Sequence, residues 1–271
     1  MARKYREMSE DTLLSDGKYN IKKESRYFGK IVVTKSEGKE NGHHYMTVST
    51  KEDLFRNPEA KKRLAEEIRR CFDFYFSKMK ISESAKVLVA CLGNENITAD
   101  SLGGKVADGL LVTSHVWKEE GMDARYGNLC AIKCGVSGTT GIESFDVLYG
   151  VIRQVKPDIV IVVDTLACGS VSRLGRTVQF SDGGIEPGAG VGNAKKSLTY
   201  DSLKIPVLAV GVPLVIYATR IVAEYSSGKV KIDDDVSELV VAARETDLIC
   251  RDYAEAIADA INSRVHKRTF I

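Results

Sequence analysis

Two short apolar runs, each followed closely by an aspartate, constrain the fold of this chain more than any other feature. The first run covers residues 86–92 and continues through a Gly-Asn turn to Asp100, and the second covers residues 158–163 and ends directly at Asp164. A continuous apolar run of this length is typical of a buried strand in a parallel sheet. In such sheets, ligands and chemistry gather at the carboxyl ends of the strands. We therefore expect Asp100 and Asp164 to lie at one edge of a single sheet.

The rest of the chain alternates between strand and helix patterns. Strands are expected at residues 30–34, 44–50, 86–92, 129–134, 158–163, 176–180 and 206–212, and helices from 57 onward and at 100–117, 143–156, 213–225 and 244–265. This alternation predicts a three-layer α/β fold with a mostly parallel twisted sheet and helices on both faces. Residues 1–28 are polar and without a clear period, so we expect an N-terminal arm or a pro-segment there, followed by a single α/β domain over residues 29–271.

Composition excludes several function classes. The 39 basic and 37 acidic residues give a net charge of +2, which does not indicate a nucleic-acid partner. No apolar run approaches the roughly 20 residues that cross a bilayer, so no membrane partner is expected. The basic start has no apolar core behind it, unlike a signal peptide. Six cysteines without an export signal favour a cytoplasmic location.

The aspartate pair suggests one chemistry and one plainer alternative. Two carboxylates held close together can share a proton and activate a water molecule. Aspartate is also a common helix cap, so Asp100 can be explained by the start of the helix that follows it. One residue can serve both purposes, and the sequence leaves both interpretations open.

A glycine-rich stretch over residues 185–193 lacks the Gly-Lys-Ser/Thr of a phosphate loop and a strand directly before it, so nucleotide binding is not favoured. We expect a loop that covers the carboxyl edge of the sheet. Backbone N–H groups in such a loop can hold an extended peptide. The predicted substrate-binding residues are Asn94, Gly188, Gly190, Gly192 and Asn193.

Metal and nucleophile chemistry find little support. The four histidines, at positions 43, 44, 115 and 266, have no zinc-site spacing. Cys168 follows Asp164 by four residues, but no base lies near it in sequence to activate it. Ser137 does not occupy a Gly-x-Ser-x-Gly motif. No metal and no cofactor are therefore expected.

Several blocks together resemble the germination proteases of spore-forming bacteria, which degrade the small acid-soluble proteins that coat spore DNA. The blocks are residues 91–103, 138–143, 163–167, 179–193 and 205–213. The resemblance spans roughly residues 29–225 and resumes in the final helix from Glu245. The chain departs from the family at Glu95 and Ala99, where a tryptophan and a proline are usual, and residues 226–235 are shorter than the family's segment.

The resemblance implies an atypical aspartic endopeptidase with a fold similar to that of hydrogenase-maturation peptidases. The family's catalytic aspartates fall on Asp100 and Asp164, one acting as general base and the other donating a proton. The resemblance further implies small acid-soluble spore proteins as substrate, a zymogen, a homotetramer and a place in the cytoplasm of the spore core.

Two other functions remain possible from sequence. Hydrogenase-maturation peptidases share the Gly-Asn and aspartate turn but recognise a bound metal, and this chain has no histidine between His115 and His266 to act as a late ligand. A non-catalytic binding protein that keeps the fold is the second alternative, since fold alone is a weak guide to function.

Overall fold

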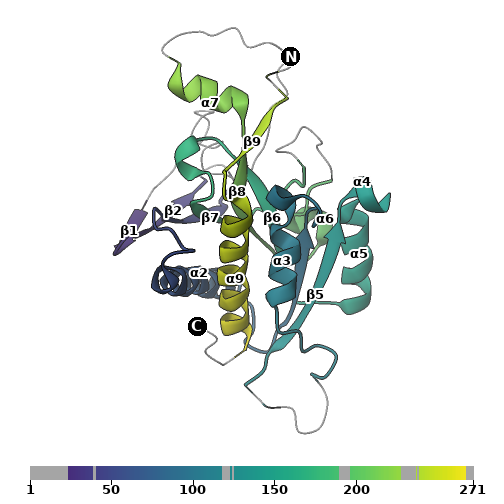
Figure 1. Ribbon diagram of the computed structural model, residues 1–271. Helices are drawn as coiled ribbons and strands as arrows, with labels where there is room; N and C mark the ends of the chain where they lie inside the picture. The colour runs from purple at the N-terminus through teal and green to yellow at the C-terminus, as the bar shows by residue number, and fades with distance from the viewer. Residues whose placement is uncertain are drawn as a thin grey trace.

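A computed structural model describes residues 24–38, 41–117, 123, 125–188, 196–226, 236 and 238–266. Its centre is one nine-stranded sheet, in which the path of paired strands runs β1-β2-β3-β7-β8-β6-β4-β5 and β9 pairs with β8 (Figure 1). The strands are β1 (Glu24–Phe28), β2 (Ile31–Glu37), β3 (His44–Thr50), β4 (Lys86–Leu92), β5 (Asn128–Gly135), β6 (Ile159–Cys168), β7 (Thr177–Ser181), β8 (Val207–Tyr217) and β9 (Val240–Ala242).

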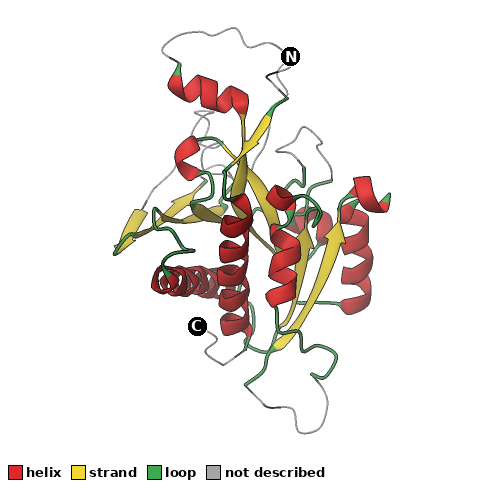
Figure 2. Cartoon of the chain, in the orientation of Figure 1, coloured by secondary structure: helices red, strands yellow, loops and turns green. Residues whose placement is uncertain are grey.

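Helices flank both faces of this sheet (Figure 2). The helices are α2 (Pro58–Lys78), α3 (Leu102–Gly109), α4 (Ser137–Thr140), α5 (Ser144–Val155), α6 (Tyr200–Leu203), α7 (Ala218–Tyr225) and α9 (Thr246–Val265), with short 3₁₀ turns η1 (Thr98–Asp100) and η2 (Val171–Arg173). The predicted α/β class with helices on both faces is confirmed.

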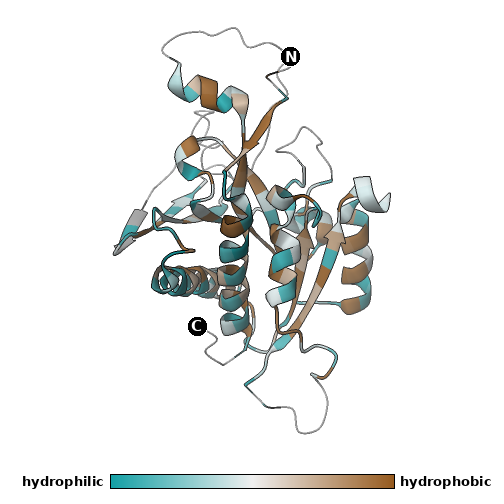
Figure 3. Ribbon diagram, in the orientation of Figure 1, coloured by the Kyte–Doolittle hydropathy of each residue, from teal (hydrophilic) through white to brown (hydrophobic). Residues whose placement is uncertain are grey.

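Side-chain alternation divides the core into two clusters. Odd-numbered residues of β4 and β6, such as Val89 and Ile161, pack with α2, α3 and α9. Even-numbered residues, such as Ala90 and Val162, pack with α5 and α6. Successive strand residues point to opposite faces, so an apolar run with both parities buried requires a layer of helices on each side. In Figure 3, much of β5 and β8 is coloured hydrophobic, whereas hydrophilic segments recur along α2 and α9.

The expectation of a mostly parallel sheet is wrong for half of it. Only the β5-β4-β6-β8 group is parallel, and β1, β2, β3, β7 and β9 join by antiparallel pairing. Residues 24–28, expected to be irregular, form β1 at the sheet's edge. Strands β1, β2 and β3 connect through short turns and need no crossover helix, so the alternation of strands and helices did not reveal an antiparallel half of the sheet.

Two predicted helices have different bounds. The helix expected over residues 100–117 ends at Gly109, because Asn262 of α9 donates to the Gly109 oxygen and accepts from the Leu111 N–H, both at 2.9 Å. The helix expected from Pro213 begins at Ala218, because β8 continues to Tyr217 between β6 and β9. Contacts with residues distant in sequence therefore set both the end of α3 and the start of α7.

Two glycines in helices have opposite surroundings. A Cβ atom on Gly103 would lie 2.1 Å from the backbone oxygen of Leu92, whereas one on Gly150 would meet no atom within 4 Å. We expect Gly103→Ala to lower the free energy of unfolding by about 1–3 kcal/mol, since the strand or helix must shift. Gly150→Ala should raise it by about 0.4–1 kcal/mol through the unfolded state. Chemical denaturation measures both, and equal effects would contradict the contact.

Candidate functional site at the end of strand β4

Asp164 lies where β6 loses one of its two neighbours. Strand β4 pairs with β6 from Val87 opposite Ile159 to Cys91 opposite Val163, and Asp164 is the next residue of β6. On its other side β6 continues against β8 as far as Cys168, so the strand is longer than predicted. Asp164 is therefore inside a strand but at the end of the β4 ladder.

The Asp164 side chain lies on the α5 face of the sheet. Val162 and Leu166, two residues away on either side, both belong to the cluster on that face. The residue is only 8% exposed, and its Oδ1 accepts a hydrogen bond from the Thr165 N–H at 2.8 Å. Asp164 thus offers a buried carboxylate at the carboxyl edge of the parallel strands.

Asp100 reaches the same edge from the turn after β4. Its Oδ2 accepts a hydrogen bond from the Asn94 N–H at 2.7 Å. Gly93 has a φ of 104°, and a Cβ atom there would lie 2.1 Å from the Asp100 backbone oxygen, so only glycine fits this close approach. The half-buried Asp100 side chain thereby ties the turn to the 3₁₀ helix η1.

The helix η1 packs against both β6 and β8 as well as α9. Asp100 is the last residue of η1 and so lies in the segment that packs against β6, the strand that carries Asp164. The two carboxylates come from different directions, Asp164 from the α5 face and Asp100 from the turn that closes the end of β4. The cap interpretation is wrong for α3, because Ser101 occupies its N-cap and the Asp100 side chain accepts from Asn94, which lies before it in the chain.

The predicted substrate-binding residues fall in two places. Asn94 lies in the turn after β4, where its Oδ1 accepts from the Asn96 N–H at 3.0 Å. Gly188 has a φ of 72° and is half-buried. Gly190, Gly192 and Asn193 lie outside the described residues. The bridge between Ile185 and Leu198, at the base of the loop, belongs to the apolar cluster on the Asp164 face.

Sequence reasoning missed a buried polar side chain in β7. Gln179 is 2% exposed, and neither its Oε1 nor its Nε2 has a hydrogen-bond partner among the described residues. A glutamine between Val178 and Phe180 in a short strand was the available signal, because a strand in mid-sheet buries both faces.

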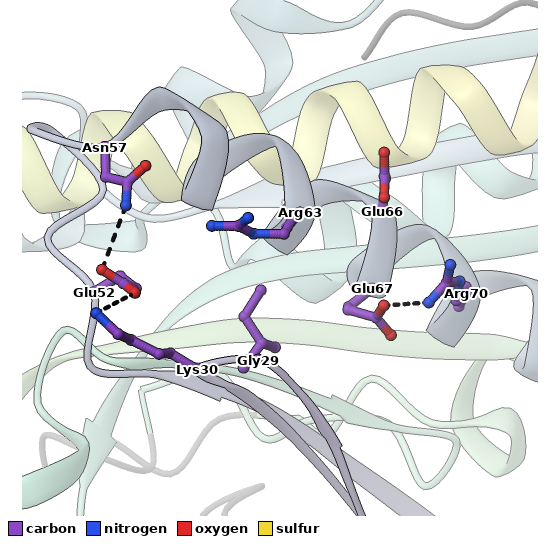
Figure 4. A pocket seen from close by; sticks show the side chains of 9 residues that line it. Gly29, Lys30, Glu52, Asn57, Arg63, Glu66, Glu67 and Arg70 are labelled. Carbon is purple, nitrogen blue, oxygen red and sulfur yellow. Dashed lines mark hydrogen bonds and ion pairs between the residues drawn. The ribbon is translucent and has the colours of Figure 1, made fainter.

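A separate cavity of about 660 Å³ lies between α2 and the turn before β2 (Figure 4). Its polar groups largely satisfy one another: Lys30 pairs with Glu52 at 2.9 Å, and Arg70 pairs with the buried Glu67. Burial is the main cause that raises the Glu67 pKa, and the charge of Arg70 opposes it. Both signs of charge are balanced here, so this cavity is a weaker candidate site than the β4 edge.

The described part of the chain shows neither a metal-binding cluster nor a membrane-spanning helix. Within that part of the chain, no group of three His, Cys, Asp or Glu side chains is arranged to hold a metal ion. His266 is buried, with Nδ1 accepting from the Gly127 N–H and Nε2 bonded to the Leu111 oxygen, so it joins α9 to neighbouring loops. No described helix has the length and apolar character needed to cross a membrane.

The cysteines near the site are poor nucleophiles. Burial raises the pKa of Cys91 and Cys134 to about 12, and the charge of Asp164 adds to the effect at Cys134. Cys168 is buried in β6. Because the thiolate is the reactive form, these side chains do not suit covalent catalysis near neutral pH.

We predict that iodoacetamide at pH 8 leaves Cys91 and Cys134 unlabelled in the folded chain and labels both in guanidinium chloride. Cys130 is half-buried and should react faster than either in the folded chain. Peptide mass spectrometry after timed labelling measures each rate. Rapid labelling of Cys134 in the folded chain would contradict its burial beside Asp164.

Comparison with known protein families identifies relatives of the chain. Residues 17–227 match the family model described as germination protease. A germination protease of Bacillus mycoides (strain KBAB4) is 38% identical over 195 residues, 71% of this chain and 53% of the relative. That of Bacillus velezensis (strain DSM 23117 / BGSC 10A6 / LMG 26770 / FZB42) is 41% identical over 189 residues, 69% of this chain and 51% of the relative.

A germination protease of Geobacillus sp. (strain WCH70) is 38% identical over 192 residues, 70% of this chain and 51% of the relative. The chain therefore spans about half the length of the curated relatives it matches. The matched family region includes η1, β6 and β7 and so contains the whole candidate site.

Proposed function

The chain belongs to the germination protease family, and on that basis we propose that it is an endopeptidase that hydrolyses small acid-soluble spore proteins during spore germination. The proposed catalytic groups are Asp100 and Asp164. Two observations support this assignment: β4 stops pairing with β6 one residue before Asp164, and η1, which ends at Asp100, packs against β6.

In the proposed mechanism, one aspartate is ionised and takes a proton from the attacking water. The other is protonated and donates to the oxygen of the scissile carbonyl. Two carboxylates at close range cannot both ionise cheaply, which favours one proton shared between them. The Asn94 N–H, which holds Asp100 in the turn, fixes one of the two in place.

The rest of the proposal follows the family resemblance. The glycine-rich loop from Gly188 to Asn193 holds the extended peptide next to the aspartates, and the fold is similar to that of hydrogenase-maturation peptidases. We further propose an atypical aspartic class, a zymogen and a homotetramer acting in the cytoplasm of the spore core. Exposed Leu239, Val240 and Val241 next to and within β9 support a contact between subunits, because exposed apolar patches often mark interfaces.

The first test replaces each aspartate. Asp100→Asn and Asp164→Asn should each lower the rate of cleavage of a small acid-soluble spore protein by at least about 100-fold, the usual contribution of an acid or base. Asparagine keeps an oxygen to accept the Asn94 or Thr165 N–H, so the thermal transition should stay close to that of wild type.

Asp158→Asn is the matched control for this test. Asp158 lies directly before β6, at the opposite edge of the sheet, and also accepts a backbone hydrogen bond, from the Lys86 N–H at 2.7 Å. This variant should cleave at the wild-type rate. Undiminished cleavage by Asp100→Asn or Asp164→Asn would contradict the mechanism, and binding without cleavage by wild type would favour the non-catalytic alternative.

A chelator separates the aspartate mechanism from the metal-dependent alternative. Among the described residues no three-ligand group fits a metal, so cleavage should be unaffected by prolonged treatment with EDTA. Cleavage is followed by gel electrophoresis and mass spectrometry of the products. Loss of activity on chelation, with recovery on addition of zinc or nickel, would support the metal-dependent maturation type instead.

A further inference from the structure

One face of the antiparallel half of the sheet is polar although it is buried. Strands β2, β3 and β7 turn their apolar residues toward α2, as Val33, Val48 and Val178 show. Their opposite face carries hydroxyl and amide side chains, all less than 10% exposed: Thr34, Ser36, Thr47, Thr177, Gln179 and Ser181. Burying polar groups costs free energy unless they find partners.

Within this polar face, Gln179 is the group with the greatest unmet hydrogen-bonding capacity. Both ends of its carboxamide are buried without a partner among the described residues. An unsatisfied buried polar group costs about 1–3 kcal/mol, and such groups in native proteins call for an explanation. A ligand that arrives from outside the chain is one such explanation.

The register of the sheet connects Gln179 to Asp164. Gln179 is paired with Gly211 of β8, and Gly211 is paired with Asp164 of β6. Residues paired across neighbouring strands point to the same face, so Gln179 and Asp164 share the α5 face with only two strand spacings, about 10 Å, between their backbones. Gly211 has no side chain to separate them.

Leu166 occupies the space over Gly211. A Cβ atom on Gly211 would lie 2.6 Å from the Leu166 Cγ, so a larger residue there would collide with this side chain. The glycine therefore leaves the space between Gln179 and Asp164 to the Leu166 side chain. The adjacent strand β3 places Thr47 opposite Gln179, which extends the row Thr47, Gln179, Gly211 and Asp164 across the sheet.

A cavity of about 530 Å³ opens beside this row. Thr47 and Thr177, which flank Gln179 across and along the sheet, both line it. Hydroxyl groups of Thr34 and Ser49 and the side chains of Lys51, Arg173 and Arg176 complete much of its wall. In the row across the sheet, Gln179 thus lies between Thr47, which lines this cavity, and the proposed catalytic Asp164.

We propose that the Gln179 carboxamide binds the substrate's main chain next to the scissile bond. Its Nε2 donates to a peptide carbonyl oxygen and its Oε1 accepts from a peptide N–H, the pair of groups that every peptide unit other than proline presents. The substrate enters from the cavity, and the side chains around Gln179 move apart to admit it. This inference rests on the proposed peptidase function.

The test uses Gln179→Met, which keeps the size of the side chain and removes both hydrogen-bonding groups. The value of kcat/KM for a peptide substrate should fall by about 10–100-fold, the loss expected when a buried hydrogen-bonded pair is broken. The thermal transition should stay unchanged or rise, because an unpaired buried amide no longer has to be desolvated.

Ser36→Ala is the matched control. Ser36 is also buried and its Oγ has no partner among the described residues, but it lies in β2, four strands from β6 in the sheet. This variant should keep wild-type kcat/KM. If Gln179→Met fails to fold, Gln179→Asn keeps the amide but shortens its reach, and it should show the same loss of kcat/KM.

Measuring peptide binding by a variant that cannot cleave tests the role of Gln179 separately from the proposed catalytic mechanism. In the Asp164→Asn background, adding Gln179→Met should raise the Kd for the uncleaved peptide about 10-fold or more. If wild type binds but does not cleave, the proposed function fails while the Kd comparison still decides the role of Gln179. Unchanged kcat/KM and Kd in the Gln179 variants, or a wild type that does not bind, would overturn the inference.

Discussion

The site depends on one close backbone contact, in which the first turn of α3 rests directly on the end of β4. Gly103 permits it, because any side chain there would collide with the backbone of Leu92. Gly93 permits the turn that follows β4, because it has a positive φ and lies in close contact with the backbone oxygen of Asp100. Together the two glycines end β4 and leave η1 beside β6.

The end of β4 gives Asp164 its surroundings. As far as Val163, β6 has neighbours on both sides and apolar side chains on both faces. From Asp164 onward β6 pairs only with β8, so the Asp164 carboxylate lies inside a buried strand but beyond the last residue that pairs with β4. The register then continues through Gly211 to Gln179, so Asp164 in the apolar, parallel half of this face is connected to the polar side chains of the antiparallel half.

Much of this arrangement could be predicted from local sequence. The runs 86–92 and 158–163 correctly indicated two central parallel strands, since strands buried on both faces are continuously apolar. They also predicted that both aspartates lie at one edge of the sheet, which stays a prediction. The end of α3 could not be predicted, because Asn262, more than 150 residues away, binds the backbone at Gly109 and Leu111. Likewise, β8 was extended past Pro213 by pairing with β6 and β9.

Gln179 shows a different limit of sequence reasoning. Gln179 is notable because its buried side-chain amide has no hydrogen-bond partner among the described residues. That can be seen only from the positions of the surrounding residues. A core that favoured stability alone would place an apolar residue there, as β8 does at Ala209 and β6 at Val162 on the same face. Burying this amide destabilises the free protein, and a bound peptide offsets that destabilisation by forming the missing hydrogen bonds. The residue therefore lowers the stability of the free protein and raises its affinity for the peptide, as expected where function, and not stability, selects a residue.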